Sequence, residues 1–327
     1  MSELSFQNVT VRYGAGRHTM VAVDGVDLVV PAGKVVGLVG ESGSGKSSLA
    51  RAAVGLAPLS GGQILLDGQP VRRPSARRRT AIQMVFQDPY GSLDPRMTIG
   101  ATVREPMTAA QRRDRRAAQA ETARLLALVN LDPGCAAALP SELSGGQRQR
   151  VALARALAGE PAVIVADEIT SALDVSVQGS VLNLVRALQR ELHLTIMFIS
   201  HNLAVVRYVS DFLAVMYLGR IVETGPADQV LSDPQHPYTQ QLLRAIPQRG
   251  GRLLDDAVHR ADSLTFTEPA DPHAPPTGCH FHPRCPVGPL VLPDRTLCRE
   301  SDPREVTGQR RNEAACYFSS TRPALQR

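Results

Sequence analysis

A glycine-rich stretch near the start of the chain has the residue types and spacing of a phosphate cradle. Residues 40–48 read GESGSGKSS and fit the pattern G-x-x-x-x-G-K-[ST]. The apolar run at 35–39 predicts a buried strand, and the residues after the loop favour a helix whose N-terminus would point at the phosphates. Lys46 adds a positive charge for the β- and γ-phosphates, and the Ser47 hydroxyl is placed to bind Mg²⁺.

A glycine-rich surface turn would be the simpler interpretation of this loop. The strand before it, the helix after it and the intact Lys-Ser pair favour phosphate binding instead. The candidate nucleotide-binding residues of the loop are Gly40, Ser42, Gly43, Ser44, Gly45, Lys46, Ser47 and Ser48.

A second apolar run ends in two acids. Residues 162–168 read AVIVADE, which is typical of a buried strand followed by two carboxylates. Beside a phosphate cradle, Asp167 is the candidate Mg²⁺ partner, directly or through water, and Glu168 is the candidate general base for the attacking water. An acidic pair can also cap the next element, but the order of cradle, strand and acids favours catalysis.

The stretch LSGGQRQR at 143–150 lies between these two elements, and with it the chain resembles the ATPase subunits of ABC transporters. The resemblance covers about residues 3 to 325 and implies a chain that binds and hydrolyses ATP with Mg²⁺. In that family LSGGQ contacts the γ-phosphate of an ATP held by the partner chain. This implies the same contact for Ser144, Gly145, Gly146 and Gln147, and Ser144 is also a good N-cap for the helix expected there.

Other stretches match that family in the same order along the chain. Tyr13 in VRYG resembles the aromatic residue that stacks on adenine, and Gln87 resembles the glutamine that senses Mg²⁺ and contacts the membrane subunit. Asp174 belongs to a stretch that resembles the loop crossing the dimer interface. His201, after the strand expected at 195–200, resembles the switch histidine near the γ-phosphate.

The resemblance therefore implies a specific division of roles. The implied catalytic residues are Lys46, Glu168 and His201, and the implied magnesium residues are Ser47, Gln87 and Asp167. One position departs from the family, which has proline where this chain has Ile169. The turn that aims Glu168 loses a φ constraint there, so we expect a reduced rate of hydrolysis or two unequal composite sites.

Four of the five cysteines lie in the last fifty residues, at Cys279, Cys285, Cys298 and Cys316. Clustered thiols in a cytosolic chain predict metal ligands rather than disulfides, but their spacing does not choose between zinc and iron–sulfur. For zinc, His280 and His282 could join the site, whereas Cys135 is expected to be a bystander. The segment PTGCHFHPRCP resembles the tail of the oligopeptide/dipeptide/nickel branch, which implies a [4Fe–4S] cluster on the four cysteines, with Zn²⁺ as the alternative.

Composition limits the remaining classes of function. The chain has 327 residues, a net charge of +5, 43% hydrophobic residues and no tryptophan. No apolar run is long enough to span a bilayer and the N-terminus does not resemble a signal peptide, so a cytosolic chain is expected. Arginines cluster at 72–79 and 112–116, but without interleaved aromatic residues we expect no binding of nucleic acid.

The order of elements predicts an α/β fold. We expect a P-loop NTPase core of the ABC ATPase type, with a mixed sheet and an antiparallel β subdomain formed by 4–13 and 21–30. A helical subdomain is expected at about 88–159, a hairpin at 213–225, and a small Cys-rich extension after the composition shifts near 247. The predicted domains are an ABC ATPase domain at 1–250 and the extension at 251–327.

The resemblance is strongest to the second, F-type ATPase subunit of the peptide-importer branch, through VFQDPYGSLDPRMTIG and HPYTQQLLRAIP. It implies an ATPase that energises uptake of di- or oligopeptides, or of a related solute such as nickel, at the cytoplasmic face of the membrane. The implied partners are a second, different ATPase subunit, two transmembrane permease subunits and an extracytoplasmic solute-binding protein. A soluble ABC ATPase in nucleic-acid repair or translation, and a non-catalytic subunit, are the alternatives.

Overall fold

The structure is a computed structural model that describes residues 1–14, 16, 19–71, 81–107, 114–245, 271, 274–305 and 313–319. The arginine cluster at 72–79, Arg112 and Arg113 lie outside the described residues. So do the tip of the turn expected at 14–18, the start of the helix expected at 109–129 and most of the segment after 245. Within the described segments, none of the helices combines the length and apolar character that a bilayer crossing requires.

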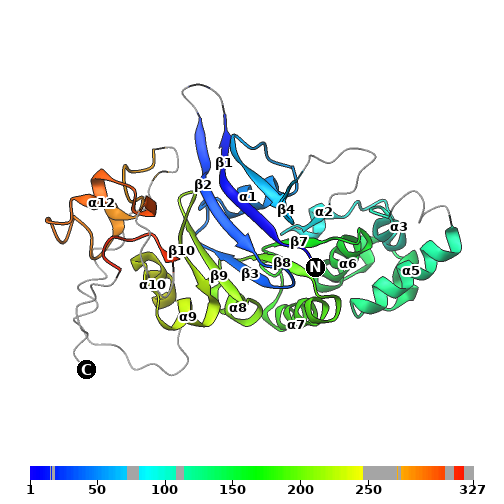
Figure 1. The fold of residues 1–327 in the computed structure, drawn as a ribbon. Coiled ribbons are helices and arrows are strands. Elements are labelled where there is room, and N and C mark those ends of the chain that lie inside the picture. Colours follow the sequence, from blue (N-terminus) through cyan, green and yellow to red (C-terminus); the bar gives the residue numbers. More distant parts are fainter. Residues whose placement is uncertain are drawn as a thin grey trace.

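Two sheets form the framework of the molecule (Figure 1). The smaller sheet is antiparallel, with the order β2-β1-β4-β5, and alternation along β1 buries Leu4 and Phe6 on one side. The prediction of this antiparallel unit is confirmed. Its strands are β1 (Leu4–Tyr13), β2 (Met20–Val30), β4 (Gly61–Leu66) and β5 (Gln69–Pro70).

The larger sheet has seven strands in the order β11-β10-β9-β3-β8-β7-β6. Strands β9, β3, β8, β7 and β6 run parallel, and β10 and β11 continue the sheet in antiparallel pairing. Because the carboxyl ends of parallel strands share one edge, the loops after β3, β7 and β8 lie together. The strands are β3 (Val35–Val39), β6 (Ile82–Val85), β7 (Val163–Asp167), β8 (Thr195–Ile199), β9 (Phe212–Tyr217), β10 (Arg220–Pro226) and β11 (Glu313–Ala314).

Helices cover both faces of the larger sheet. Helix α1 contacts β1 and β2 of the smaller sheet and β7 of the larger one, so it joins the two sheets. As predicted, the described part of 88–159 is largely helical. The helices are α1 (Lys46–Ala53), α2 (Pro89–Ser92), α3 (Ile99–Arg104), α5 (Arg115–Leu128), α6 (Gly145–Ala158), α7 (Val175–Leu192), α8 (Leu203–Val209), α9 (Ala227–Ser232), α10 (Pro237–Arg244) and α12 (Leu297–Glu300).

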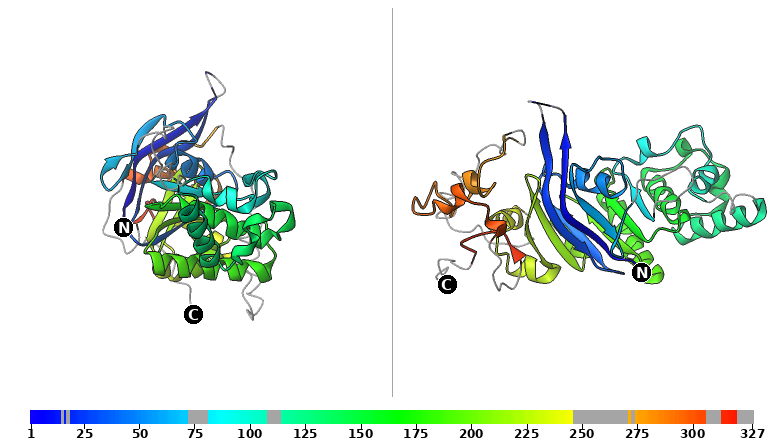
Figure 2. Two further views of the ribbon diagram at one scale, coloured as in Figure 1. Left: turned by 90° about the vertical axis from the view of Figure 1, so that its right-hand side faces the viewer. Right: turned by 45° about the horizontal axis from the view of Figure 1, so that its top comes forward.

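The C-terminal segment and the helices α3 and α5 lie at opposite ends of the molecule (Figures 1 and 2). The segment consists mainly of turns, with short 3₁₀ helices at His282–Arg284 and Pro303–Glu305. It is tied to the framework through β11, which pairs with β10 at the edge of the larger sheet. The described parts of the chain after 270, residues 271, 274–305 and 313–319, are called the C-terminal extension below.

Candidate functional site

The loop from Gly40 to Gly45 joins β3 to α1 and has the geometry of an anion-binding turn. Gly45 occupies the N-cap position of α1 with φ of 103°, and a Cβ there would lie 2.2 Å from the carbonyl oxygen of Ala22. Gly45 makes no side-chain cap, so the first N–H groups of α1 face the loop without a capping side chain. Only glycine can combine this backbone conformation with so close an approach of β2.

Lys46 is folded back into this loop. Its ammonium group donates to the carbonyl oxygens of Gly40 and Glu41, each at 2.8 Å, and to the Ser44 hydroxyl at 3.2 Å. Burial lowers the pKa of Lys46, while Glu168, Asp167 and Glu41 oppose that shift. The buried positive charge is therefore held over the centre of the loop, where an incoming anion would meet it.

The two acids at the end of β7 have different surroundings. Asp167 is buried and accepts a hydrogen bond from the Ser47 hydroxyl at 3.2 Å. Burial raises the pKa of Asp167, and the neighbouring Glu168 adds to this effect, whereas the bond from Ser47 opposes it. A carboxylate and a hydroxyl in contact are hard oxygen ligands of the kind that Mg²⁺ prefers.

Glu168 lies between two side chains that the sequence analysis placed near the nucleotide. Gln87 donates from Nε2 to its Oε2 at 2.9 Å, and Nδ1 of His201 lies 3.2 Å from its Oε1. The backbone of Glu168 has φ of 47°, and its N–H donates to the carbonyl of Ile199 on β8. Gln87 and His201 thus both contact the carboxylate of Glu168, although the three residues come from three separate loops.

The phosphate loop and Glu168 line one pocket with a volume of about 570 Å³, which lies within the usual range for small-molecule sites. Ser42, Gly43, Gly45, Lys46, Ser47, Ser48, Gln87 and Glu168 all contribute to it. Tyr13, at the end of β1, is not among the described residues that line it.

The LSGGQ stretch lies elsewhere on the molecule. Ser144 is the N-cap of α6, and it forms a capping box with Gln147 through bonds of 2.9 and 3.3 Å. Gly146 is buried, and a Cβ there would lie 2.4 Å from Cγ1 of Val177. The described residues that line the pocket do not include 144–147 or the exposed Asp174, which precedes α7. This chain therefore does not bring its own LSGGQ stretch to its own phosphate loop.

Known proteins are similar to this chain in sequence and in fold. Residues 23–171 match the family model described as ABC transporter, and residues 222–288 match that of the oligopeptide/dipeptide transporter C-terminal region. A probable peptide ABC transporter ATP-binding protein of Sinorhizobium fredii is 46% identical over 81% of this chain and 75% of its own length. The oligopeptide transport ATP-binding protein AppF of Bacillus subtilis is 42% identical over 91% of this chain and 90% of its own length.

This chain belongs to the ABC transporter ATPases. A solved dimeric ATP-binding cassette in a post-hydrolysis state, bound to ADP and Pi, agrees with the assignment. It superposes with a TM-score of 0.58 at 28% identity, over 68% of this chain and 98% of its own. This ABC ATPase therefore binds and hydrolyses ATP as a subunit of a transporter.

The structure shows what replaces proline after Glu168 in this ABC ATPase. Ile169 is 1% exposed and packs in the larger hydrophobic core. Ser171 donates to the carbonyl of Glu168 from both its N–H, at 3.0 Å, and its hydroxyl, at 2.9 Å. Packing and hydrogen bonds thus hold the turn that a proline ring would otherwise restrict.

Sequence reasoning missed the residues of the C-terminal extension that reach the same pocket. Pro275, Pro276, Thr277 and His280 line it, together with Arg220 at the start of β10. Arg284 makes two hydrogen bonds to the carboxylate of Glu41 in the phosphate loop, at 2.9 and 3.2 Å. The histidine and the arginine were visible between the cysteines, but no periodicity or spacing relates them to a loop more than 200 residues earlier.

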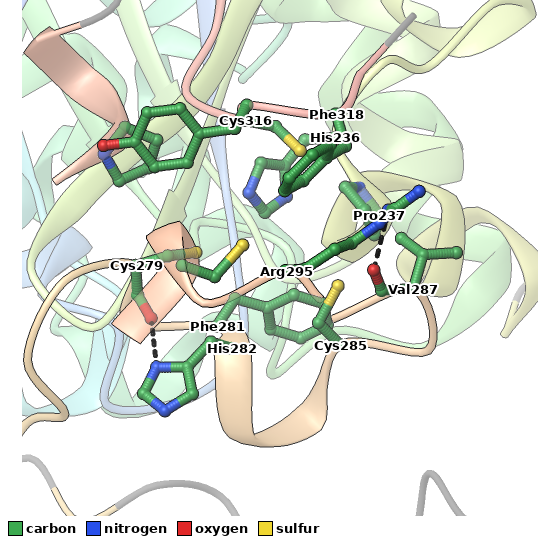
Figure 3. A pocket seen from close by; sticks show the side chains of 13 residues that line it. His236, Pro237, Cys279, Phe281, His282, Cys285, Val287, Arg295, Cys316 and Phe318 are labelled. Atoms are coloured by element: carbon green, nitrogen blue, oxygen red, sulfur yellow. Dashed lines mark hydrogen bonds between the residues drawn. The ribbon is translucent and has the colours of Figure 1, made fainter. Parts of the chain in front are cut away.

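The four clustered cysteines of this ABC ATPase line a second pocket, which is called the thiol pocket below (Figure 3). Cys279, Cys285 and Cys316 project their sulfur atoms toward the same space, and no disulfide joins any of the described cysteines. Burial raises the pKa of Cys279 and of Cys285 to about 12, and the neighbouring thiols add to both shifts. Cys135 lies away from this pocket, in the 3₁₀ helix Pro133–Ala137.

The arrangement of these thiols bears on the predicted metal. Among the described residues, no group of three or more His, Cys, Asp or Glu side chains is placed so that it could hold a metal ion. The two histidines that could join a zinc site contact the backbone through Nδ1. Nδ1 of His280 lies 3.1 Å from the carbonyl oxygen of Leu218, and Nδ1 of His282 lies 2.9 Å from the carbonyl oxygen of Cys279. Four cysteine thiols are a donor set that suits either structural zinc or an iron–sulfur cluster, so the residue types do not choose between the two.

Proposed function

We propose that this ABC ATPase energises the import of di- or oligopeptides, or of a related small solute such as nickel. The match of residues 222–288 to the oligopeptide/dipeptide transporter C-terminal region carries this proposal, because the description of that region names peptide transporters. The names of the relatives from Sinorhizobium fredii and Bacillus subtilis point in the same direction. No observation on the described residues favours the alternative of nucleic-acid repair or translation.

The proposed chemistry assigns one step to each group of residues. The loop residues from Gly40 to Ser48, with Lys46, hold the phosphates of ATP, and Tyr13 stacks on the adenine. Ser47, Asp167 and Gln87 bind Mg²⁺, which neutralises phosphate charge. Glu168 is the general base that takes a proton from the attacking water, and His201 holds the geometry of the γ-phosphate. The contacts of Glu168 with Gln87 and His201 support this grouping.

The proposed assembly contains two ATPase subunits, two permease subunits and an extracytoplasmic solute-binding protein, with this chain at the cytoplasmic face. We propose a heterodimer of ATPases in which Ser144, Gly145, Gly146 and Gln147 contact the ATP of the partner and Asp174 lies at the interface. Their position outside this chain's own pocket supports the idea. The proposed domains are 1–250, with a helical subdomain at about 88–159, and the Cys-rich extension at 251–327.

Uptake by cells tests the cargo. Cells that lack the gene would be complemented with the wild-type gene or with Glu168→Gln, and given a labelled dipeptide, a labelled pentapeptide or labelled nickel. We expect the wild-type gene alone to restore uptake of a peptide. If only nickel uptake is restored, the cargo is the metal and not a peptide. If uptake of all three stays at the level of cells that lack the gene, an importer of this class is contradicted.

We also propose that Cys279, Cys285, Cys298 and Cys316 hold a [4Fe–4S] cluster, with Zn²⁺ as the alternative. Such a group would give the extension, which has few regular elements, a covalent centre around which to fold. Metal and sulfide analysis of anaerobically purified protein distinguishes the two. About four irons with matching sulfide would support the cluster, whereas one zinc or no metal would exclude it.

A further inference from the structure

Two ends can be distinguished in the pocket that holds Lys46. One end consists of the phosphate loop with Gln87 and Glu168. The other consists of Met20, Val21 and Ala22 of β2, the turn between β9 and β10, and four residues of the C-terminal extension. Because the phosphates of a bound nucleotide occupy the first end, its ribose and base must occupy the second.

We propose that the C-terminal extension is a working part of the nucleotide site and that Pro275, Pro276, Thr277 and His280 contact the nucleoside of bound ATP. These four residues are called the nucleoside wall. The proposal rests on the assignment of this pocket as the ATP site. It adds a binding surface from a part of the chain whose sequence pointed only to metal binding.

The chemistry of the nucleoside wall suits a flat, partly polar ligand. Two prolines and the apolar side chains of Met20 and Val21 line the same pocket, which favours contact with the face of an aromatic base. Thr277 and the nearby Arg220 add polar groups at the same end. His280 is buried, and its Nδ1 lies 3.1 Å from the carbonyl oxygen of Leu218 in the turn between β9 and β10.

Polar contacts hold the wall against the framework. Arg220 donates to the carbonyl of Gly278 at 3.0 Å and forms ion pairs with Asp24 at 2.8 Å and Asp302 at 3.1 Å. Arg304 donates to the carbonyls of Asp24 and Gly25 at 2.6 and 3.1 Å. These groups are partly buried, and such a bonded network keeps a binding surface in place rather than leaving it as a loose flap.

The same extension also reaches the phosphate end of the pocket. The Arg284 guanidinium, whose side chain is 8% exposed, makes a two-point contact with Glu41. Glu41 in turn supplies one of the carbonyl groups that hold Lys46, and its N–H donates to the hydroxyl of Tyr238. The extension therefore contacts both ends of the site, directly at the nucleoside and through Glu41 at the phosphates.

The absence of tryptophan from the chain allows a direct test. Pro275→Trp places a single reporter in the exposed part of the nucleoside wall, and Leu290→Trp places one in the same extension at a residue that is 64% exposed and does not line the pocket. With the full chain, we expect ATP and ADP to change the fluorescence of Pro275→Trp, with a Kd equal to that from direct equilibrium binding of labelled nucleotide. The fluorescence of Leu290→Trp should not change.

A second variant tests contact energy rather than proximity. The double change Pro275→Gly/Pro276→Gly removes the two rings. We expect it to weaken the binding of ATP and the binding of ADP by the same factor, about fivefold, because the lost contact lies at the nucleoside end. Lys46→Ala should weaken the binding of ATP more than the binding of ADP, since it removes a contact to the terminal phosphates.

The outcomes separate this proposal from the function on which it rests. A silent Pro275→Trp reporter at saturating ATP, or wild-type affinity in the double glycine variant, would overturn the nucleoside wall and leave the ATPase intact. Failure of the wild-type chain to bind labelled ATP at all would overturn both.

Discussion

At the scale of single residues, the surroundings of Glu168 determine what this ATPase can do before a nucleotide arrives. Its carboxylate accepts a bond from Gln87 and lies in contact with His201. These two contacts hold the carboxylate of the proposed base in one position.

Replacement of Glu168 separates binding from hydrolysis. Glu168→Gln keeps the size of the side chain and its capacity to bond Gln87 and His201, but it removes the proposed base. We expect phosphate release to fall by about 10² to 10⁴-fold while the Kd for ATP stays within about twofold of the wild type. Phosphate release and equilibrium binding of labelled ATP measure the two quantities.

A matched control is Glu191→Gln near the end of α7, which is exposed and outside the pocket. It should leave both quantities unchanged. Equal rates in Glu168→Gln and the wild type would show that another group acts as the base or that the chain is a non-catalytic subunit.

At the scale of elements, α10 and the phosphate loop are joined by one buried hydroxyl. Tyr238 is fully buried in α10, and its hydroxyl accepts a hydrogen bond from the N–H of Glu41 at 2.9 Å. Its ring packs against Tyr217 at 4.6 Å and Phe281 at 5.4 Å between centroids. The aromatic cluster thus positions the first residues of the loop from behind.

Tyr238→Phe tests this link with little change in packing. The substitution leaves the N–H of Glu41 without its partner, so we expect the free energy of unfolding to fall by about 1 to 3 kcal/mol. ATP binding should weaken as well, because the loop loses a support. Thermal or urea unfolding and nucleotide binding measure these effects. An unchanged stability would indicate that Glu41 finds water in place of the hydroxyl.

The Arg284–Glu41 contact offers a second test at this scale. Arg284→Glu places two carboxylates together, and we expect weaker ATP binding, by about tenfold or more, and lower stability. The exchanged pair Glu41→Arg/Arg284→Glu should recover part of the lost affinity, because it restores attraction between the extension and the loop. A purely structural role for each residue alone would instead give losses that add in the double variant.

The elements near the N-terminus were predictable because their information is local. The strand expected at 4–13 is β1, and the strand expected at 35–39 is β3. The cradle, the acids and the helical character of 88–159 also followed from short patterns. The proximity of Gln87, Glu168 and His201 could be found only from the family resemblance and the structure. Local sequence patterns do not predict the order of strands in a parallel sheet.

The extension was least predictable for the same reason. Cysteine spacing pointed to metal binding, but contacts such as Arg284 with Glu41 join residues 243 positions apart in the chain. Side-chain pairs at that separation leave no periodic pattern. The proposed role of Tyr13 on adenine likewise stays a prediction, because Tyr13 is not among the described residues that line the pocket.

At the scale of the whole molecule, the extension connects two pockets. His280 and Arg284 face the nucleotide side, while Cys279 and Cys285 line the thiol pocket within the same short segment. Loss of order at the thiols should therefore reach the nucleotide site.

Cys316→Ser removes one proposed ligand just after β11. We expect iron content to fall below the value of about four per chain that the proposed cluster gives the wild type, and the extension to lose thermal stability. Cys135→Ser is the matched control, because Cys135 does not line the thiol pocket. Iron and sulfide analysis and thermal unfolding measure the outcome. Equal metal content in both variants would contradict a four-cysteine site.

The pairing of β11 with β10 has a consequence for how the protein is made. Synthesis proceeds from the N-terminus, and segments fold as they leave the ribosome. The phosphate loop, both acids and the parallel sheet are complete by residue 226, yet residues 275–285 and the pairing of Ala314 with Glu223 come almost 50 and 90 residues later. A ribosome stalled on this message would thus expose a half-built ATP pocket with its buried face open to water. A nascent chain of this kind is a natural substrate for chaperones. It remains one until the residues of the C-terminal extension, which are synthesised last, cover the exposed surface.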